Sequence, residues 1–443
     1  MVWLLVALFA CSAAPERRGV IVVSIDTLRA DRVGAYGNTA GLTPNLDRVA
    51  AEAVIFDQAY AQANETLYSH AALFTGRYAS RLAPLGAQFG LPDEVTTLAE
   101  RVRDAGWDTA AFVAGGHLSK AFGLDPGFTT YDGAAQWASL ADTGPAALRW
   151  LDARKDPERP FLLFVHGYDP HDRYLKPPPF GYALADRDYT GAGRDVGRRP
   201  GGVSDVLSGR ATMRADLAEL LPFLHPRFDR GAGIERLDPD AVLLGPEDNA
   251  HLGALYDGAV AWGDAALGLF IAGLVARDVY DDVTLVVLSD HGEELGEAGV
   301  FHHRYGLDDN VAHVPLVVRF PHGEGGGRRL SGLAGLIDVA PTLLDYAGIG
   351  ALPEAEGRSL RGMIERGEAG REVVVSQGAL RLLSARTADA RLTAEGVSLD
   401  NAYAPALLRS LPIDGVTLRL DGAAASEAPL REALAGFTSG GAP

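Results

Sequence analysis

Short runs of consecutive apolar residues alternate along this chain with longer segments whose apolar positions repeat at helical spacing. The apolar runs predict buried strands at 19–25, 109–114, 161–165, 284–288 and 315–321. The helical spacing predicts helices that begin near 43 and after 69, and helices over 95–105, 248–278 and 338–345. Strands that alternate with helices in this way indicate an α/β fold with a large, mainly parallel central sheet wrapped by helices.

Two segments depart from this alternation. Residues 174–245 are rich in Pro, Gly and Arg, which predicts a long excursion that acts as a lid near a binding pocket. After residue 367, short alternating runs predict a small antiparallel sheet. We therefore expect a leader over 1–18, a main domain over 19–366 that contains the excursion, and a small C-terminal subdomain over 367–443.

The first residues have the composition of an export signal. The stretch 2–10 is apolar throughout and too short to span a bilayer, and it is followed by Cys11, the single cysteine. This arrangement predicts a bacterial lipoprotein, exported to the periplasm or cell surface and in contact with the membrane only through a lipid on Cys11. A cleaved signal peptide with an incidental cysteine is the alternative. No later run is expected to be apolar and long enough for a membrane span.

The charge balance narrows the choice of partners. The chain has 40 Lys and Arg against 58 Asp and Glu, so its formal net charge is -18. We expect no nucleic-acid partner, because a protein that binds nucleic acid needs a basic face. An anionic substrate would need local positive charge in its binding site. Salt screens the repulsion between the acidic protein and such a substrate beyond roughly 8 Å.

Two of the predicted strands end in metal-ligating side chains. Asp26 follows the run 19–25, and Asp290 with His291 follows the run from 284. Ligands of open α/β sheets bind at the carboxyl ends of the strands, so these three residues are predicted to form one metal site. The carboxylates suit Ca, Mg or Mn, and the imidazole makes Zn an option.

A hydroxyl-bearing segment between these strands supplies a candidate nucleophile. Thr66 lies in the run Thr66-Leu-Tyr-Ser69-His70, just before a predicted helix. Its hydroxyl would need a metal ion to ionise at neutral pH. The alternative is that Thr66 caps the helix, a frequent role for Thr. Both roles are compatible, because a helix N-terminus also stabilises an anion.

Six motifs in order along the chain resemble the sulfatase family of the alkaline phosphatase superfamily. They are residues 24–31, 42–47, Ser69-His70 with Thr75-Gly76, residues 289–293, residues 313–316 and residues 337–342. The resemblance implies an α/β/α sandwich with a small C-terminal antiparallel α+β subdomain. It also implies a metal-dependent hydrolase of sulfate or phosphate esters, acting on a small-molecule, glycan or lipid ester.

The chain departs from the family at the nucleophile. Formylglycine sulfatases carry Cys or Ser in a C/S-x-P-S-R signature, and this chain has Thr66 at that position. Many sulfatases also have paired acids where this chain has Asp26 and Thr27. The resemblance therefore points to a threonine-nucleophile variant. A phosphodiesterase or phospho-headgroup transferase of the superfamily is the alternative, and a catalytically inactive surface binding protein is the second.

The resemblance also suggests roles for further residues. His70 aligns with the signature arginine and is expected to support Thr66, while Ser69 is a helix cap, a substrate contact or a rival nucleophile. His171 is expected to contact substrate, to protonate the leaving group or to bind a second metal. His303 matches a position that touches the ester oxygens. His117, after two glycines, is a pocket candidate for substrate binding.

Two weaker candidates stand beside these. His302 is the less favoured of the two adjacent histidines 302 and 303, and Asp169 is a possible ligand of a second metal ion or simply a turn residue before Pro170. One metal ion would favour a sulfatase, whereas a second ion held by Asp169, His171 and His303 would favour a two-metal phosphodiesterase.

Overall fold

The computed structural model describes residues 19–82, 90–133, 135–171, 174–191, 246–297, 301–303, 306–378, 382–395, 417–423 and 427–438. The leader with Cys11, and residues 192–245 of the predicted lid, lie outside these residues. The expectations about lipid attachment, export and the lid therefore stay predictions, as does the domain boundary at 367.

An eight-stranded sheet forms the centre of the described structure, in the order β10-β2-β9-β6-β1-β5-β3-β4. The strands are β1 Gly19–Ile25, β2 Val54–Tyr60, β3 Asp108–Phe112, β4 Thr130–Asp132, β5 Phe161–Gly167, β6 Val283–Leu288, β9 Leu316–Arg319 and β10 Arg328–Gly335. Among them only β9 runs antiparallel to its neighbours β2 and β6. The predicted α/β class with a mainly parallel sheet is confirmed.

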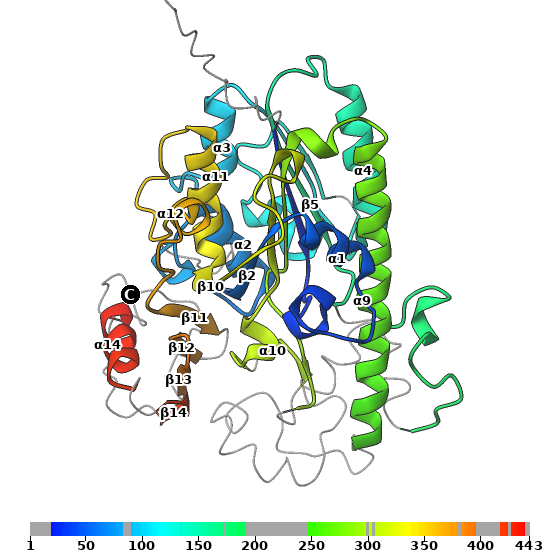
Figure 1. Ribbon diagram of the computed structural model, residues 1–443, viewed down its shortest axis with the longest axis vertical. Coiled ribbons are helices and arrows are strands. Elements are labelled where there is room, and N and C mark those ends of the chain that lie inside the picture. The colour runs from blue at the N-terminus through cyan, green and yellow to red at the C-terminus, as the bar shows by residue number, and fades with distance from the viewer. Residues whose placement is uncertain are drawn as a thin grey trace, which may run out of the picture.

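Helices cover both faces of this sheet, as Figure 1 shows. One layer contains α1 Pro44–Ala51, α4 Leu140–Ala153 and α9 Pro246–Val275, and the other contains α2 Thr66–Thr75, α3 Leu98–Asp104, α11 Val339–Ala347 and α12 Arg361–Arg366. The short helix α10 Asp309–Ala312 precedes β9. The 3-10 helices are Ala30–Arg32, Gly34–Tyr36, Ala79–Arg81, Gly116–Leu118, Lys120–Phe122, Phe180–Tyr182, Tyr280–Asp282, Pro321–Gly323 and Leu336–Asp338.

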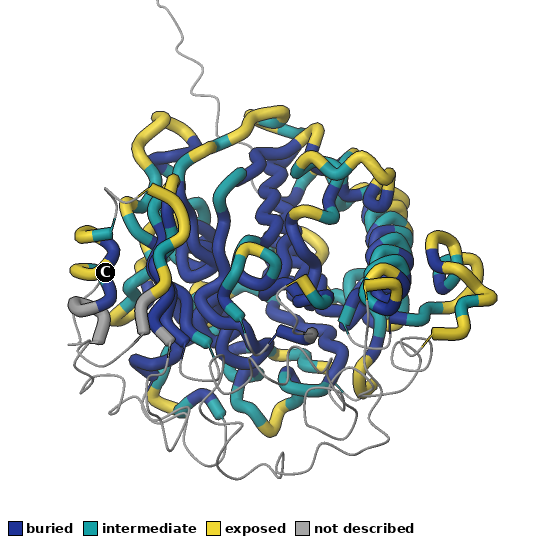
Figure 2. Tube along the Cα trace, turned by 90° about the horizontal axis from the view of Figure 1, so that it is seen from below, coloured by how far each residue is buried: buried dark blue, intermediate teal, exposed yellow. Residues whose placement is uncertain are grey.

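The alternation of side chains along β1 explains the two cores. Val20 and Val22 point to the layer of α2 and α11, while Ile21, Val23 and Ile25 point to the layer of α1 and α9. A strand in the middle of a covered sheet is apolar on both faces, which is why its sequence is a continuous apolar run. Figure 2 shows the buried residues gathered in the interior and the exposed residues in the outer turns.

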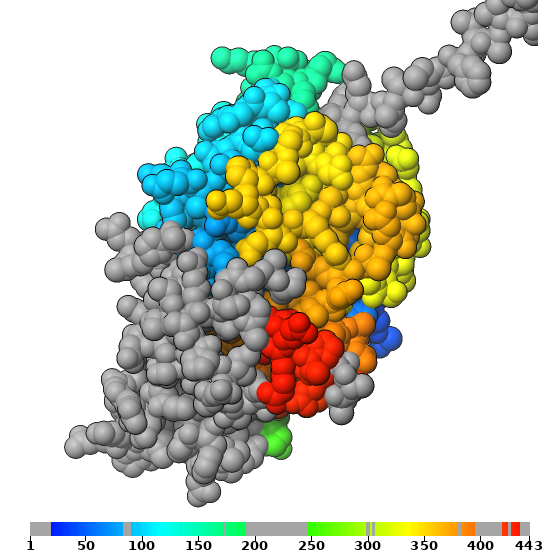
Figure 3. All heavy atoms as spheres, turned by 90° about the vertical axis from the view of Figure 1, so that its left-hand side faces the viewer, coloured from blue at the N-terminus to red at the C-terminus, as the bar shows by residue number. Residues whose placement is uncertain are grey.

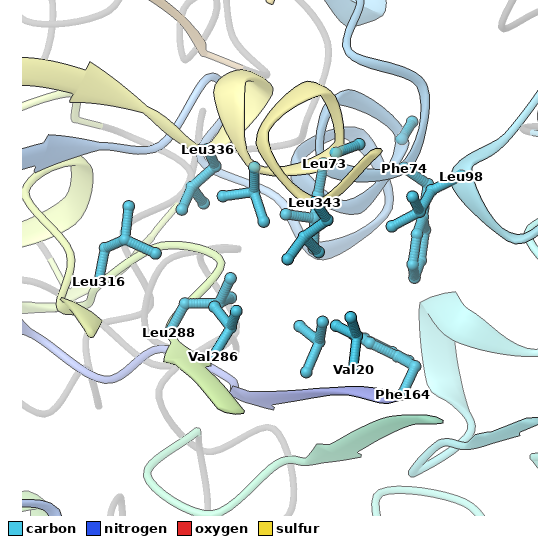
Figure 4. Packing of buried hydrophobic residues seen from close by; sticks show 14 of the residues in the cluster. Val20, Leu73, Phe74, Leu98, Phe164, Val286, Leu288, Leu316, Leu336 and Leu343 are labelled. Atoms are coloured by element: carbon cyan, nitrogen blue, oxygen red, sulfur yellow. The ribbon is translucent and has the colours of Figure 1, made fainter. Parts of the chain in front are cut away.

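Figure 4 shows the first of these cores from close by. Val20 of β1 and Phe164 of β5 lie opposite Leu73 of α2 and Leu343 of α11, and all four side chains are buried. Burying a side chain of this size stabilises the fold by roughly 1.5–3 kcal/mol. This packing fixes α2, the helix that begins with Thr66, against the strands that carry the candidate metal ligands.

Helix α9 corrects one expectation. By length and composition this helix is apolar enough to cross a membrane. This differs from the expectation that no run after the N-terminal leader is long and apolar enough to do so. Half of its most apolar window is buried, and its Asp264 carboxylate accepts hydrogen bonds from the backbone amides of Asn45 and Leu46 in α1. These contacts are those of a core helix, because the apolar side chains pack on the sheet and on α4.

The C-terminal region forms a second, antiparallel sheet with the order β11-β12-β13-β14. Its strands are β11 Val374–Gly378, β12 Leu382–Arg386, β13 Ala390–Glu395 and β14 Thr417–Gly422, and α14 Glu427–Thr438 packs on it through Leu430 and Leu434. Figure 3 shows α14, in red, on the molecular surface. The predicted small antiparallel sheet is therefore confirmed. Strands β7 Glu294–Leu295 and β8 Phe301–His302 form a third, two-stranded sheet.

Candidate active site

The carboxyl ends of three adjacent strands bring the predicted metal ligands together. Ser24 of β1 pairs with His166 of β5 on one side and with Leu288 of β6 on the other. Asp26 and Asp290 each follow their strand by one or two residues, so both emerge at the same edge of the sheet. This is where α/β folds bind ligands.

Asp26, Asp290 and His291 form a compact ligand cluster. Their donor atoms lie within 4.8 Å of one another, and all three residues are buried. Asp290 Oδ1 accepts hydrogen bonds from the backbone N–H of Thr27 at 3.2 Å and of His291 at 2.9 Å. His291 Nδ1 donates to the Gly292 carbonyl at 3.0 Å, which leaves the lone pair on Nε2. The cluster therefore presents Asp26 Oδ1, Asp290 Oδ2 and His291 Nε2.

These three atoms fit a divalent cation. Each is buried and has no hydrogen-bond partner within the described part of the chain. Burial raises the pKa of Asp26 to about 6, against the opposing effects of His291 and the Thr66 hydroxyl. Burial and the charge of Asp26 likewise raise the pKa of Asp290. Unpaired buried carboxylates are costly, and a cation would remove that cost.

A strained turn holds the first ligand in place. Thr27 has a φ of 58°, which is rare for a β-branched residue. Its carbonyl accepts a hydrogen bond of 2.6 Å from the hydroxyl of Tyr256, and the same hydroxyl accepts from Arg29 N–H at 3.1 Å. Helix α9, which carries Tyr256, therefore helps to fix the loop after β1. Such backbone strain concentrates at functional sites.

Thr66 lies against the cluster. Its hydroxyl donates to Asp26 Oδ2 at 3.1 Å, and the side chain is 1% exposed. Glu65 occupies the N-cap position of α2 and Thr66 is the first helical residue, so the alternative that Thr66 is the cap is wrong. The positive end of the helix dipole nevertheless points at the cluster, and this favours an anion there.

His70 and Ser69 support the framework from the next turn of α2. His70 Nδ1 donates to the Thr66 carbonyl at 2.7 Å and its Nε2 accepts from Ser24 Oγ at 3.0 Å. Burial lowers the pKa of His70 to about 4, so the ring is neutral. Ser69 Oγ donates to the Asp290 carbonyl at 2.7 Å. Both side chains therefore contact the backbone around the cluster, and neither is hydrogen-bonded to the Thr66 hydroxyl.

Two residues in the site were not singled out from the sequence. His166 Nε2 lies 3.2 Å from Asp26 Oδ2, and burial lowers the pKa of His166 to about 4. Burial raises the pKa of Tyr168 well above its ordinary value, against a hydrogen bond from the His117 backbone and one shared with the Thr66 side chain. His166 is the last but one residue of the buried strand β5, and a polar side chain near the carboxyl end of an apolar run is the signal that would have identified it.

A second cluster contains three histidines. The ring nitrogens of His171, His302 and His303 lie within 4.8 Å of one another. His303 also lies beside the first cluster, with its ring centroid 4.2 Å from that of His291. His302 and His303 therefore both belong to the site, although the sequence favoured His303 alone.

Asp169 does not join either cluster. Its carboxylate accepts hydrogen bonds from Ser139 Oγ and from Leu140 N–H, and so it fixes the start of α4. The expectation that Asp169 is a ligand of a second metal ion is wrong for this geometry.

His117 lies at the edge of the site, beside an exposed aromatic residue. Its backbone N–H donates to the Tyr168 hydroxyl, and its ring lies 6.3 Å from that of Trp137. Trp137 is 48% exposed, has a φ of 55° and lies 5.8 Å from the ring of His171. A large exposed aromatic side chain on strained backbone therefore lies beside both His117 and His171.

The C-terminal sheet braces the segment that leads to Thr66. Ser376 Oγ in β11 donates to the Ala61 carbonyl at 2.6 Å, and Gln377 N–H donates to the Gln62 carbonyl at 2.9 Å. Asn64 N–H in turn donates to the Gln377 carbonyl. The small subdomain therefore contributes to the position of the candidate nucleophile.

Comparisons of the chain with known proteins identify its family. The sulfatase family model matches residues 18–349, which is well over half of the chain. The N-acetylglucosamine-6-O-sulfatase of Bacteroides thetaiotaomicron is 23% identical over 401 residues, which is 79% of this chain and 71% of that protein. An arylsulfatase of Clostridium perfringens is 23% identical over 410 residues, 78% of each chain.

Solved structures share the fold. A protein in complex with its substrate D-glucosamine-2-N,6-O-disulfate superposes with a TM-score of 0.70 at 19% identity, covering 96% of this chain and 98% of its own. The phosphonate monoester hydrolase of Agrobacterium radiobacter superposes with a TM-score of 0.68 at 20% identity, covering 95% and 94%. The family match, the fold and the strand-end cluster lead to one conclusion: the chain belongs to the sulfatase family of ester hydrolases.

Proposed function

We propose that this protein hydrolyses sulfate esters with Thr66 as the in-line nucleophile and a divalent cation held by Asp26, Asp290 and His291. The observation that carries the proposal is the hydrogen bond of the Thr66 hydroxyl to Asp26 Oδ2, while Asp26 Oδ1 has no hydrogen-bond partner in the described part of the chain. A cation in the cluster would offset the negative charge of the sulfate group and lower the pKa of the threonine hydroxyl.

The side chains of this chain supply the remaining steps. Asp26 Oδ2 orients the Thr66 oxygen for attack on sulfur, and the hydroxyl proton passes to this carboxylate. The new bond joins the Thr66 oxygen to sulfur while the bond from sulfur to the alcohol oxygen breaks. A water molecule then attacks the same sulfur, and the bond from sulfur to the Thr66 oxygen breaks. Asp26 returns its proton to the Thr66 oxygen, and the histidine that protonated the alcohol takes a proton from the water, so that sulfate is released.

His171 and His303 are proposed to contact the departing alcohol oxygen, which needs a proton. Burial and neighbouring positive groups hold the pKa of His171 well below its ordinary value. The negative charge of a bound ester would oppose that effect and favour the protonated ring. His117 and Ser69 remain candidates for substrate binding: His117 lines the edge of the site, whereas the Ser69 hydroxyl is directed at the Asp290 backbone.

The donor set favours oxygen-preferring cations, so we propose Ca, Mg or Mn, with Zn as an option because His291 is included. The named sulfatase relatives act on N-acetylglucosamine and aryl esters, and we propose a small-molecule or glycan sulfate for this chain. Export with a lipid on Cys11 would place the enzyme in the periplasm or at the cell surface, where it could act on esters from outside the cell.

A phosphate or phosphonate ester is the second candidate substrate. Thr27 stands beside Asp26 where many sulfatases have a second acid, so the first cluster carries fewer negative charges. The structural likeness to a phosphonate monoester hydrolase agrees with this alternative at the level of fold.

The test is a paired assay of aryl sulfate, aryl phosphate, alkyl aryl phosphodiester and aryl phosphonate after removal of metal and reloading with Ca, Mg, Mn or Zn. The proposal expects sulfate to be turned over fastest and only with metal. A preference for the phosphorus esters would support the second candidate, and metal-independent turnover would overturn the proposed role of the cluster.

A further inference from the structure

His166 is a buried imidazole near the end of β5 that has no part in the reaction steps proposed above. Its side chain is fully buried, and its Nε2 lies 3.2 Å from Asp26 Oδ2. The same Asp26 oxygen accepts the hydrogen bond of the Thr66 hydroxyl at 3.1 Å. The imidazole and the candidate nucleophile therefore meet at one oxygen of a proposed metal ligand.

The proton of the His166 ring lies on Nε2. The ionised carboxylate of Asp26 accepts hydrogen bonds and has none to donate. His166 Nδ1 is buried and has no hydrogen-bond partner among the described residues. A proton on Nδ1 would leave a buried N–H unpaired and would set two lone pairs against each other at the contact with Asp26. With the proton on Nε2, the ring donates a hydrogen bond to the carboxylate.

The ring donates this hydrogen bond without carrying a charge. Burial lowers the pKa of His166 to about 4, although the nearby Asp290 carboxylate opposes this shift. His166 therefore orients the Asp26 carboxylate and leaves its negative charge in place. Cations such as Ca, Mg and Mn are bound by charged carboxylate oxygens of this kind.

Neighbouring rings fix the direction of the His166 N–H. The ring of Tyr168 meets the His166 ring edge-on, with centroids 4.7 Å apart, and the ring of His70 does so at 5.4 Å. His70 is itself held by hydrogen bonds to the Ser24 hydroxyl and to the Thr66 carbonyl. Packing on two sides therefore locks the imidazole in the direction of the carboxylate, as precise placement of a metal ligand requires.

Asp26 needs such a partner because its two oxygens have different tasks in the proposed reaction. Oδ1 has no hydrogen-bond partner in the described part of the chain and faces the cation site, while Oδ2 contacts Thr66. The hydrogen bond from Thr66 cannot hold the carboxylate throughout, because its proton is transferred when the Thr66 oxygen bonds to sulfur. The His166 N–H takes no part in that transfer and stays in place through both steps.

We propose that His166 is a positioning residue whose Nε2–H holds the Asp26 carboxylate, with Oδ1 directed at the cation site and Oδ2 at the Thr66 oxygen. The inference rests on the proposed function, because it takes Asp26 as a metal ligand and Thr66 as the nucleophile. Hydrogen-bond partners of metal ligands contribute roughly 10–100-fold to metal affinity or activity.

The experiment compares two substitutions that differ in the N–H group. His166→Leu replaces the ring with an apolar side chain, whereas the amide nitrogen of His166→Gln can take the place of Nε2. The full chain is stripped with a chelator, and its affinity for Mn²⁺ is measured without substrate from the electron paramagnetic resonance signal of the unbound ion. We expect binding roughly 10–100-fold weaker in His166→Leu and within about threefold of the wild type in His166→Gln.

Activity at saturating manganese tests the contact with the nucleophile separately from metal affinity. The substrate is the ester that the wild type turns over fastest. We expect kcat to remain about tenfold lower in His166→Leu, because Oδ2 is no longer held toward the Thr66 oxygen, and His166→Gln should recover most of this loss.

His251→Leu is the matched control. His251 is also a buried histidine, but its ring stacks on that of Tyr189 at 4.1 Å, and it belongs to neither cluster of the described residues. This variant should bind Mn²⁺ as the wild type does. Circular dichroism and urea unfolding confirm that each variant is folded.

The outcomes separate this inference from the proposed function. A His166→Leu variant with the manganese affinity or the kcat of the wild type, or a His166→Gln variant as impaired as His166→Leu, overturns the positioning role even if sulfate esters are cleaved. Losses in His166→Leu that His166→Gln restores support the role, whichever ester is hydrolysed. A wild type that binds no manganese overturns both this inference and the proposed cation site.

Discussion

Replacing Asp26 with Asn should make the metal-free protein more stable above about pH 6 while abolishing its response to metal. Asp26 is fully buried, and its Oδ1 has no hydrogen-bond partner among the described residues. Its Oδ2 accepts from Thr66 and lies near His166 Nε2, and an amide group can serve both neighbours. The substitution therefore removes a buried charge at little cost in hydrogen bonds.

The magnitude follows from the pKa of Asp26. Burial raises that pKa from its ordinary value of 3.8 to about 6 in the metal-free protein. A difference of about 2 in pKa corresponds to about 3 kcal/mol. Because the folded state holds the proton more tightly than the unfolded state, this carboxylate lowers the stability as the pH rises from about 4 to 6. Above that window the Asn variant should be more stable by up to about 3 kcal/mol.

The assay is urea unfolding of both proteins in a chelator, at pH values on both sides of this window, and again with saturating metal. Metal at 1,000 times its dissociation constant should reverse the order, since it adds about 4.1 kcal/mol to a protein that binds it. Asp156→Asn, at an exposed carboxylate, controls for loss of charge. An Asn variant that is no more stable than the wild type in chelator, or equally stabilised by metal, would refute this reasoning.

Three further predictions follow from other parts of the structure. Arg371→Met should cost about 3–5 kcal/mol in urea unfolding, because it leaves the buried carboxylate of Asp338 without its guanidinium partner, and unchanged stability would contradict this. Trp137→Ala should raise KM for ring-bearing esters more than it lowers kcat, with Trp137→Phe partly restoring KM, since the exposed indole lies beside His171. Cys11→Ser should abolish metabolic labelling with palmitate, and labelling that persists would exclude a lipid on Cys11.

The central strands and the first metal cluster could be predicted from the sequence because their signals are local. A strand covered on both faces is a continuous apolar run, and a charged residue at its end is conspicuous, as Asp26 is after β1. Strands β2, β4 and β10 of the central sheet were not predicted. β10 carries Arg328 and Arg329 at the edge of the sheet, where one side is open to solvent, so its composition resembles a loop.

The second cluster depends on features that only the folded chain reveals. His302 joins the second cluster with its backbone in a left-handed conformation, and no sequence pattern predicts that conformation at a histidine. Asp169 was a reasonable ligand candidate by its place near His171, but its carboxylate is used to fix the start of α4. The helix α3 begins at Leu98 and not near 95, because Thr97 and Glu100 form a capping box there.

The central claim is that the Thr66 oxygen attacks the ester. The direct measurement is kcat for 4-nitrophenyl sulfate with metal-loaded wild type, Thr66→Ala and Thr66→Ser, with metal content and folding verified for each. The account predicts a loss of at least about 1,000-fold in Thr66→Ala and partial activity in Thr66→Ser, which keeps a hydroxyl. A Thr66→Ala protein that retains its metal and turns over within about tenfold of the wild type would contradict it.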